Sequence, residues 1–266
     1  MLKKKDVSIL ITGQMRTFKK CINNLFDNII NCNENYNFKI YILTEFFIND
    51  GGTPKNIYNY DFNNIDEFEN DIKNSYGINL KFLFIESEHN KITYPDYINN
   101  YGPWKVLYKN YVLYNKIHNE LCLNNENIII RMRPDIVITN PLILNNIILN
   151  NNILIVSSIQ SRNNSWYHNR DWDHMLITNN TGYKLWSNYC FFLDIKLDNF
   201  DSSLFRKRKT NFNNKGFWIE NIDNFKNDYI YLYSIIATQL FSYYIEDNRY
   251  TIEFDLDNVY TTPIRI

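Results

Sequence analysis

Residues 128–138 place three charged side chains in a stretch that otherwise has the apolar, β-branched composition of a buried strand. Side chains of a strand point alternately to its two faces, so we expect Arg131, Arg133 and Asp135 to share one face. Charged groups are almost never buried without partners. These three therefore either pair with one another or line a cleft that holds an anionic ligand or a metal.

Pro134 indicates where this strand ends, because proline has no N–H to donate to a sheet. In open α/β sheets, ligands bind beyond the carboxyl ends of the strands. The sequence therefore favours the cleft over mutual pairing of the three charged groups.

The first half of the chain alternates between buried strands and amphipathic helices. We expect strands at residues 7–12, 38–44, 80–85 and from 128 onward, and helices that begin near Thr17, Asn64 and Trp104. This alternation predicts an α/β fold with a mostly parallel sheet flanked by helices. With 266 residues and 45% hydrophobic content, the chain is long enough to form a single domain with a sizeable core.

The second half is expected to complete this domain. The pattern predicts one or two strands within residues 142–156, a helix over 181–193, a further helix over about 229–246 and a final strand over 250–254.

Composition and missing motifs exclude several functions. No G-x-G-x-x-G or G-x-x-x-x-G-K-[ST] pattern occurs, which argues against hydride transfer and nucleotide triphosphate hydrolysis. The formal net charge is −1 and the basic residues are spread along the chain, so no nucleic-acid partner is expected. The cysteines Cys21, Cys32, Cys122 and Cys190 are dispersed among apolar residues, as reduced structural cysteines are.

The N-terminal apolar run, residues 7–11, is too short for the core of a signal peptide and far too short to span a bilayer. Together with the cysteine pattern, this predicts a cytoplasmic protein with no transmembrane segment.

A second polar segment, Gly13-Gln14-Met15-Arg16-Thr17, follows the first strand. It combines a flexible turn, an amide and a guanidinium near the start of a helix, where backbone N–H groups attract phosphate. The alternative for this loop is an ordinary surface arginine after a strand.

A third polar cluster covers residues 166–174. Its carboxylates Asp171 and Asp173 would lie on the same face of an extended segment, and with His168 and His174 they could bind a divalent cation or supply a general base. Exposed or hydrogen-bonded histidines are the alternative for His168 and His174.

Three segments, taken in order, resemble a family of small GT-A-type glycosyltransferases from bacterial surface-glycan gene sets and giant DNA viruses. These segments are Gly13-Gln14-Met15-Arg16-Thr17, Arg131-Met132-Arg133-Pro134-Asp135-Ile136 and Asp173-His174-Met175-Leu176-Ile177-Thr178. The family pairs an initial G-Q-x-R turn with an R-x-R-P-D element, and the resemblance extends to about Leu193.

The resemblance implies one GT-A-like domain over residues 1–266, with a nucleotide-sugar-binding half (1–140) and an acceptor-side half (141–266). Gly13, Gln14, Arg16, Arg131, Arg133 and Asp135 would then bind a nucleotide-sugar donor. Asp135 would hold a divalent metal, Mn²⁺ or Mg²⁺, against the donor diphosphate, and Asp173 or Asp171 would act as base for a glycan acceptor. Such an enzyme would need a stabilised diphosphate leaving group and, for inverting transfer, that base.

Two further hypotheses stay open. One is a non-catalytic glycan-binding module that grips its ligand with aromatic residues such as Trp166, Tyr167 and Trp172. The other is a phosphate-ester enzyme that uses the same arginines. Fold class alone does not decide between them.

Overall fold

We analysed a computed structural model of the chain. It describes residues 4–46, 62, 64–95, 102–121, 128–156, 158, 174–197, 248–254 and 259–264. The structural statements below concern these residues. Several predictions lie outside the described residues: the helix at 229–246, His168, Asp171, Asp173 and the aromatic residues Trp166, Tyr167 and Trp172.

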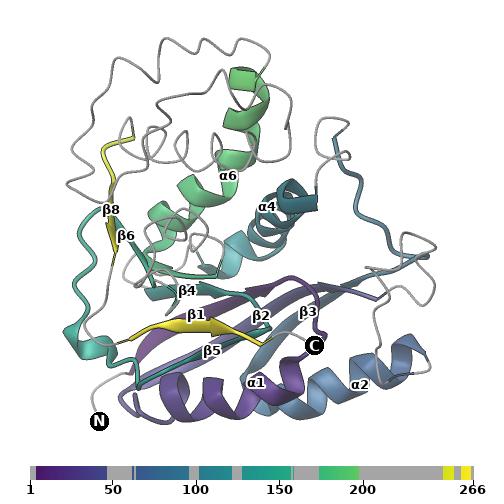
Figure 1. Ribbon diagram of the computed structural model, residues 1–266, viewed down its shortest axis with the longest axis horizontal. Helices are drawn as coiled ribbons and strands as arrows, with labels where there is room; N and C mark the ends of the chain where they lie inside the picture. Colours follow the sequence, from purple (N-terminus) through teal and green to yellow (C-terminus); the bar gives the residue numbers. More distant parts are fainter. Residues whose placement is uncertain are drawn as a thin grey trace.

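The described strands form one seven-stranded sheet in the order β3-β2-β1-β4-β7-β6-β8 (Figure 1). Their bounds are β1 Lys5–Thr12, β2 Tyr36–Glu45, β3 Leu80–Glu86, β4 Ile128–Met132, β6 Asn152–Ile155, β7 Met175–Thr178 and β8 Thr251–Phe254. Among them, β7 alone runs antiparallel to its neighbours, β4 and β6. The predicted α/β fold with a mostly parallel sheet is confirmed.

Helices cover both faces of this sheet (Figure 1). One face carries α1 (Phe18–Leu25), which continues as a π-helical turn (Phe26–Ile30), and α2 (Ile65–Tyr76). The other carries α4 (Gly102–Leu121) and α6 (Asn180–Leu197). Short 3₁₀ turns cover Gly77–Asn79 and Leu144–Asn146.

The central strands are apolar on both faces, as expected for a sheet between two helical layers. On β1, Ile9 and Ile11 belong to the core under α1 and α2. Between them, Leu10 packs in the second core, under α4 and α6. All three side chains are at most 1% exposed, so β1 is anchored from both sides.

Most predicted element boundaries hold, and of the two predicted N-caps one caps its helix and the other does not. Asn64 caps α2, because its side chain accepts a hydrogen bond from the N–H of Glu67 at 2.9 Å. Thr17 occupies the N-cap position of α1, but its hydroxyl donates instead to the carbonyl of Ile264, at 3.3 Å. Within residues 142–156 the structure has one strand, β6.

The prediction that Pro134 marks the end of the strand from residue 128 is confirmed, and the segment 128–138 is not one continuous strand. It divides into β4, a turn around Pro134, and β5 (Ile136–Ile138). β5 pairs with β9 (Thr261–Pro263) in a separate two-stranded sheet. Because Pro134 cannot donate to the main sheet, the chain leaves it there, and Arg131, Arg133 and Asp135 do not share one strand face.

The order of the parallel strands reverses next to β1. β2 and β3 lie on one side of β1, and β4, which follows them in the sequence, lies on the other. Ligands of such sheets bind outside the carboxyl ends of the strands at this reversal. Gly13 follows β1 and Arg133 follows β4, so both arginine-containing loops begin at that place.

Within the described part of the chain, no helix combines the length and the apolar character that crossing a membrane requires.

Asn24 of α1 holds β5 in place through its side-chain amide. The amide donates to the carbonyl of Ile138 at 2.9 Å and accepts from the N–H of Ile138 at 2.8 Å. The side chain thus makes the two hydrogen bonds that a neighbouring strand would make. It fixes the element that follows the Pro134 turn.

We expect Asn24→Ala to lower the free energy of unfolding by about 1–3 kcal/mol, because both backbone groups of Ile138 lose a partner. Asn23→Ala is the matched control: Asn23 is the preceding residue of α1 and is exposed, so its loss should change stability by less than about 0.5 kcal/mol. Urea denaturation measures both. Equal stability of the two variants would contradict the role of Asn24.

Candidate functional site

The loops after β1 and β4 touch at Gly13 and Pro134. A Cβ atom on Gly13 would lie 3.4 Å from Cδ of Pro134, and Gly13 has φ of +127°, a conformation that residues with side chains rarely adopt. The N–H of Gly13 donates to the carbonyl of Leu43 in β2, at 3.3 Å. Glycine is therefore required at this position by backbone conformation, and the two loops form one surface.

The C-terminal segment ties the same loops together. The N–H of Ile264 donates to the carbonyl of Asp135 at 2.7 Å, while the carbonyl of Ile264 accepts from Thr17 at 3.3 Å. Sequence reasoning missed this strand. The β-branched and aromatic residues from Val259 to Thr262, followed by Pro263, are the pattern that would have indicated a short edge strand.

Arg133 and Asp135 form a two-point ion pair at the end of β4. Nε of Arg133 lies 2.8 Å from Oδ1 of Asp135, and Nη2 lies 2.6 Å from Oδ2. The Arg133 side chain is 27% exposed and that of Asp135 is 11% exposed. The backbone N–H of Arg133 donates to the carbonyl of His174 at 3.0 Å, which fixes the base of the side chain.

Arg131 lies in the interior instead. It is fully buried on the α4 and α6 face of the sheet, with Nη2 3.1 Å from the Thr12 hydroxyl and Nε 3.3 Å from Oδ1 of Asn110. Its guanidinium carbon lies 5.0 Å from the ring centroid of Trp186. Arg131 therefore supports the packing beneath the loops after β1 and β4. Arg133 is the more exposed of the two arginines.

Asn110 is the acceptor at the centre of this buried cluster. Its Oδ1 also accepts from the hydroxyl groups of Thr12, at 2.8 Å, and Tyr183, at 3.3 Å. Its amide nitrogen donates to the carbonyl of Val106 at 2.6 Å, which fixes the orientation of the group. Burial raises the pKa of Tyr183, against the opposite influence of Arg131, so this hydroxyl stays protonated and available as a donor.

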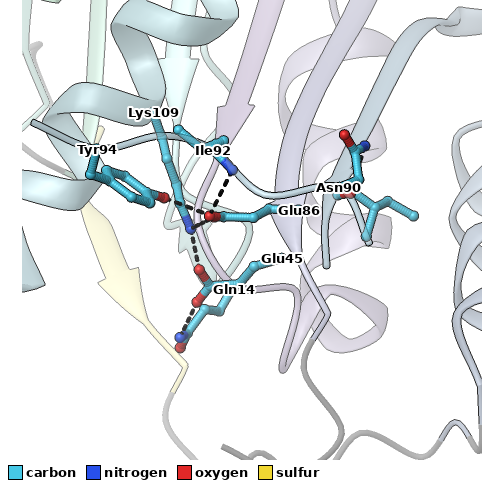
Figure 2. A network of polar contacts seen from close by, with 8 residues as sticks. Gln14, Glu45, Glu86, Asn90, Ile92, Tyr94 and Lys109 are labelled. Atoms are coloured by element: carbon cyan, nitrogen blue, oxygen red, sulfur yellow. Dashed lines mark hydrogen bonds and ion pairs between the residues drawn. The ribbon is translucent and has the colours of Figure 1, made fainter. Parts of the chain in front are cut away.

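A second polar network lies beside the first, centred on Lys109 (Figure 2). Nζ of Lys109 lies 3.0 Å from Oε2 of Glu86 and also contacts Oε2 of Glu45. The other oxygen of Glu45 accepts a hydrogen bond from Nε2 of Gln14. Glu45 therefore fixes the orientation of Gln14, and Lys109 fixes Glu45.

Glu86 has two further donors in this network. The Tyr94 hydroxyl donates to its Oε2 at 2.8 Å, and the N–H of Ile92 donates to its Oε1 at 3.3 Å (Figure 2). Burial, and then the neighbouring Glu86 carboxylate, raise the pKa of Tyr94, so the phenol remains a donor. These bonds fix the chain that follows β3.

Two consecutive residues of α4 thus reach the carboxyl ends of the four adjacent strands β3, β2, β1 and β4. Lys109 contacts the last residues of β2 and β3, and Asn110 contacts residues at the ends of β1 and β4. The four strand residues are Glu45, Glu86, Thr12 and Arg131.

The structure brings the first two motifs together at Gly13 and Pro134, and the predicted residues of these motifs differ in exposure. Gln14 is half-buried and Arg16 is exposed, while Met15 between them is 1% exposed and anchors the loop. Asp171 and Asp173 lie outside the described residues, so their predicted role as bases stays a prediction. His174, the next residue, lies 3.4 Å from the Thr261 hydroxyl through Nδ1.

Sequence reasoning missed Glu45, Glu86, Lys109 and Asn110. Glu45 and Glu86 each end an apolar strand, which is the same pattern that identified Arg133. Asn110 shares helical spacing with the buried Leu113 and Ile117, so a polar residue on an apolar face was the available signal.

The Arg133 guanidinium occupies the carboxylate of Asp135, where the sequence predicted a metal. Both carboxylate oxygens of Asp135 accept hydrogen bonds from Arg133. Among the described residues, no group of three or more His, Cys, Asp or Glu side chains is arranged to hold a metal ion. The residues around Asp135 thus fit a guanidinium, and metal binding there stays a prediction that requires Arg133 to leave.

Comparison with known proteins gives a distant likeness to a solved structure. No family model and no curated protein matches the chain. The apo-form glycosyltransferase GlyE of Streptococcus pneumoniae TIGR4 is a similar solved structure, with 12% sequence identity and a TM-score of 0.40. The match covers 94% of this chain and 45% of GlyE, so the chain spans less than half the length of that protein.

We expect Lys109→Met to lower the free energy of unfolding by about 3–5 kcal/mol, because Glu45 and Glu86 lose the ammonium between them. Lys116→Met, on an exposed position of the same helix, should cost less than about 1 kcal/mol. Adding Glu45→Gln to Lys109→Met should restore part of the loss. Chemical denaturation of the single and double variants measures this coupling, and simple additivity would contradict it.

Arg131→Lys should also destabilise the protein, by about 2–4 kcal/mol, although it keeps the charge. Lysine lacks the planar fork that meets Thr12 and Asn110 and stacks near Trp186. Arg249→Lys, at an exposed position before β8, is the control, with an expected change below about 0.5 kcal/mol. If Arg131→Lys instead unfolds like the control, Arg131 does not support the fold as argued.

Proposed function

We propose that this protein is a glycosyltransferase that moves a sugar from a nucleotide-diphosphate donor to a hydroxyl group of a glycan. The observation that carries the proposal is the meeting of Gly13 and Pro134. Each belongs to a motif that resembles the GT-A-type family, and the motifs meet where the strand order reverses. Two distant motifs joined at the expected binding edge of an α/β sheet support a shared ligand.

The charges near this junction suit a diphosphate. Arg133 is partly exposed at the end of β4, and the exposed Arg16 follows Gly13 just before α1. Guanidinium groups bind phosphate oxygens with two parallel hydrogen bonds, and backbone N–H groups at a helix start favour the same anion. Positive charge held there would stabilise the diphosphate as it departs from the sugar.

The neighbouring ends of β1 and β2 suit the nucleoside. In related sheet architectures an acidic residue near the end of the second strand binds ribose hydroxyl groups. Glu45 occupies that place, and its bond from Nε2 of Gln14 leaves Oε1 of Gln14 in the role of an acceptor. We therefore assign the nucleoside to Gln14 and Glu45, and the diphosphate to the side of Arg133.

The acceptor half of the proposal rests on the sequence. Asp173 or Asp171 would take the proton of the acceptor hydroxyl if transfer inverts the sugar. On this proposal residues 1–140 bind the donor and residues 141–266 bind the acceptor. The predicted cytoplasmic location agrees with a supply of nucleotide sugars.

The first test is donor turnover. Incubation with a panel of nucleotide sugars and a glycan mixture should release one nucleoside diphosphate in a protein-dependent manner. Arg16→Gln should lower the rate by about 10- to 100-fold, because a charge-assisted contact to the diphosphate is lost. Arg249→Gln, at an exposed position before β8, should leave the rate unchanged.

Other products would overturn the proposal. Release of inorganic phosphate would indicate a phosphate-ester enzyme that uses the same arginines. Glycan binding without consumption of any donor would indicate a binding module.

A further inference from the structure

Arg133 and Asp135 form an ion pair at the end of β4. The two hydrogen bonds of 2.8 and 2.6 Å use both oxygens of Asp135. Both residues are also held through the backbone: Arg133 donates its N–H to His174, and Asp135 accepts at its carbonyl from Ile264. The backbone of the pair is therefore fixed by two residues outside its own loop, His174 just before β7 and Ile264 just after β9.

This geometry conflicts with a divalent ion on Asp135. Such an ion binds a carboxylate oxygen at about 2.0–2.2 Å, where it would lie within a few ångströms of the Arg133 nitrogens that bond the same oxygens. Two like charges at that separation repel strongly in a partly buried site. The carboxylate can serve the metal or the guanidinium, and in this structure it serves the guanidinium.

We propose that Arg133 itself supplies the positive charge that binds the donor diphosphate, and that Asp135 is the residue that positions it. The proposal rests on the proposed function and makes it more specific: nucleoside diphosphate binding does not require a divalent ion. The Arg133 side chain is 27% exposed, and Asp135 holds its Nε and Nη2 atoms. Asp135 orients the plane of the guanidinium group, and the exposed part of Arg133 binds the phosphate oxygens.

The contrast with Arg131 supports this assignment. Both arginines lie close together in the sequence, yet Arg131 is fully buried while the Arg133 side chain is 27% exposed. Arg131 has its place among Thr12, Asn110 and Trp186. Of the two, Arg133 is the one that a diphosphate at the ends of β1 and β4 would meet.

Isothermal titration calorimetry with UDP, GDP, CDP and ADP, each with EDTA or with Mn²⁺, tests the proposal. We expect one nucleoside diphosphate to bind with the same affinity in both conditions, within about 3-fold. Arg133→Gln should weaken that binding by about 10-fold or more in both conditions, and Arg133→Lys should restore part of it. Asp135→Asn should weaken binding by less than Arg133→Gln, equally with and without Mn²⁺.

Arg249→Gln is the matched control, because Arg249 is exposed and precedes β8, at the opposite end from the carboxyl ends of the parallel strands. Its affinity should equal that of the parent protein. Thermal unfolding of each variant without nucleotide identifies any loss of fold, and the partial rescue by Arg133→Lys separates charge from structure.

Three results would overturn the inference. Binding that requires Mn²⁺ and disappears in Asp135→Asn would show a metal site and leave the proposed glycosyltransferase function standing. Unchanged affinity in Arg133→Gln would remove Arg133 from the diphosphate site, also without touching that function. No binding of any nucleoside diphosphate in either condition, together with no donor turnover, would overturn both.

Discussion

The candidate site depends on the charge balance at the carboxyl ends of the adjacent strands β1 to β4. Glu45 and Glu86 bring two carboxylates to this edge, and Lys109 lies between them, with side chains at most 16% exposed. Such a buried cluster is tolerated only if its members satisfy one another. Lys109 of helix α4 pairs with both carboxylates. The next residue, Asn110, accepts hydrogen bonds from Thr12 of β1 and Arg131 of β4.

The two arginines of the second motif, Arg131 and Arg133, have different roles. Arg131 is buried, where its guanidinium group donates hydrogen bonds to neutral oxygen atoms and lies over the Trp186 ring. Arg133 lies at the rim, where Asp135 orients it. The turn at Pro134 makes this division possible, because it takes the chain out of the main sheet between the two side chains. The loop after β1, with Gln14 held by Glu45, completes the same surface.

Hydrophobic pattern was sufficient to predict most of the fold. The apolar strands and the helical spacing from Thr17, Asn64 and Trp104 located the elements of the first half, and Asn64 proved to be a true cap. The reversed direction of β7 was beyond such reasoning, because a buried strand has the same composition in either orientation. Pairing of β5 with β9 depends on residues more than a hundred positions apart, and local sequence carries no trace of it.

Polar residues that interrupt or follow a strand directed the sequence analysis to the candidate site, as at Gly13, Gln14, Arg133 and Asp135, and their role in ligand binding stays a prediction. The sequence could not separate the buried Arg131 from the exposed Arg133, since alternation along one strand assigned both to the same face. Lys109 and Asn110 required knowledge of which strands α4 crosses. Whether a side chain at a strand end is buried depends on tertiary packing. This burial distinguishes Arg131, which supports the fold, from Arg133, which is proposed to bind a ligand.

The most direct test of the account is hydrogen–deuterium exchange of the protein with and without a saturating nucleoside diphosphate. If the loops after β1 and β4 form one binding surface, the backbone amides of residues 13–17 and those of Arg133, Asp135 and Ile136 should become protected together when the nucleotide binds. Protection of one loop without the other, or of distant segments alone, would show that the two motifs do not share a ligand and would contradict the central claim.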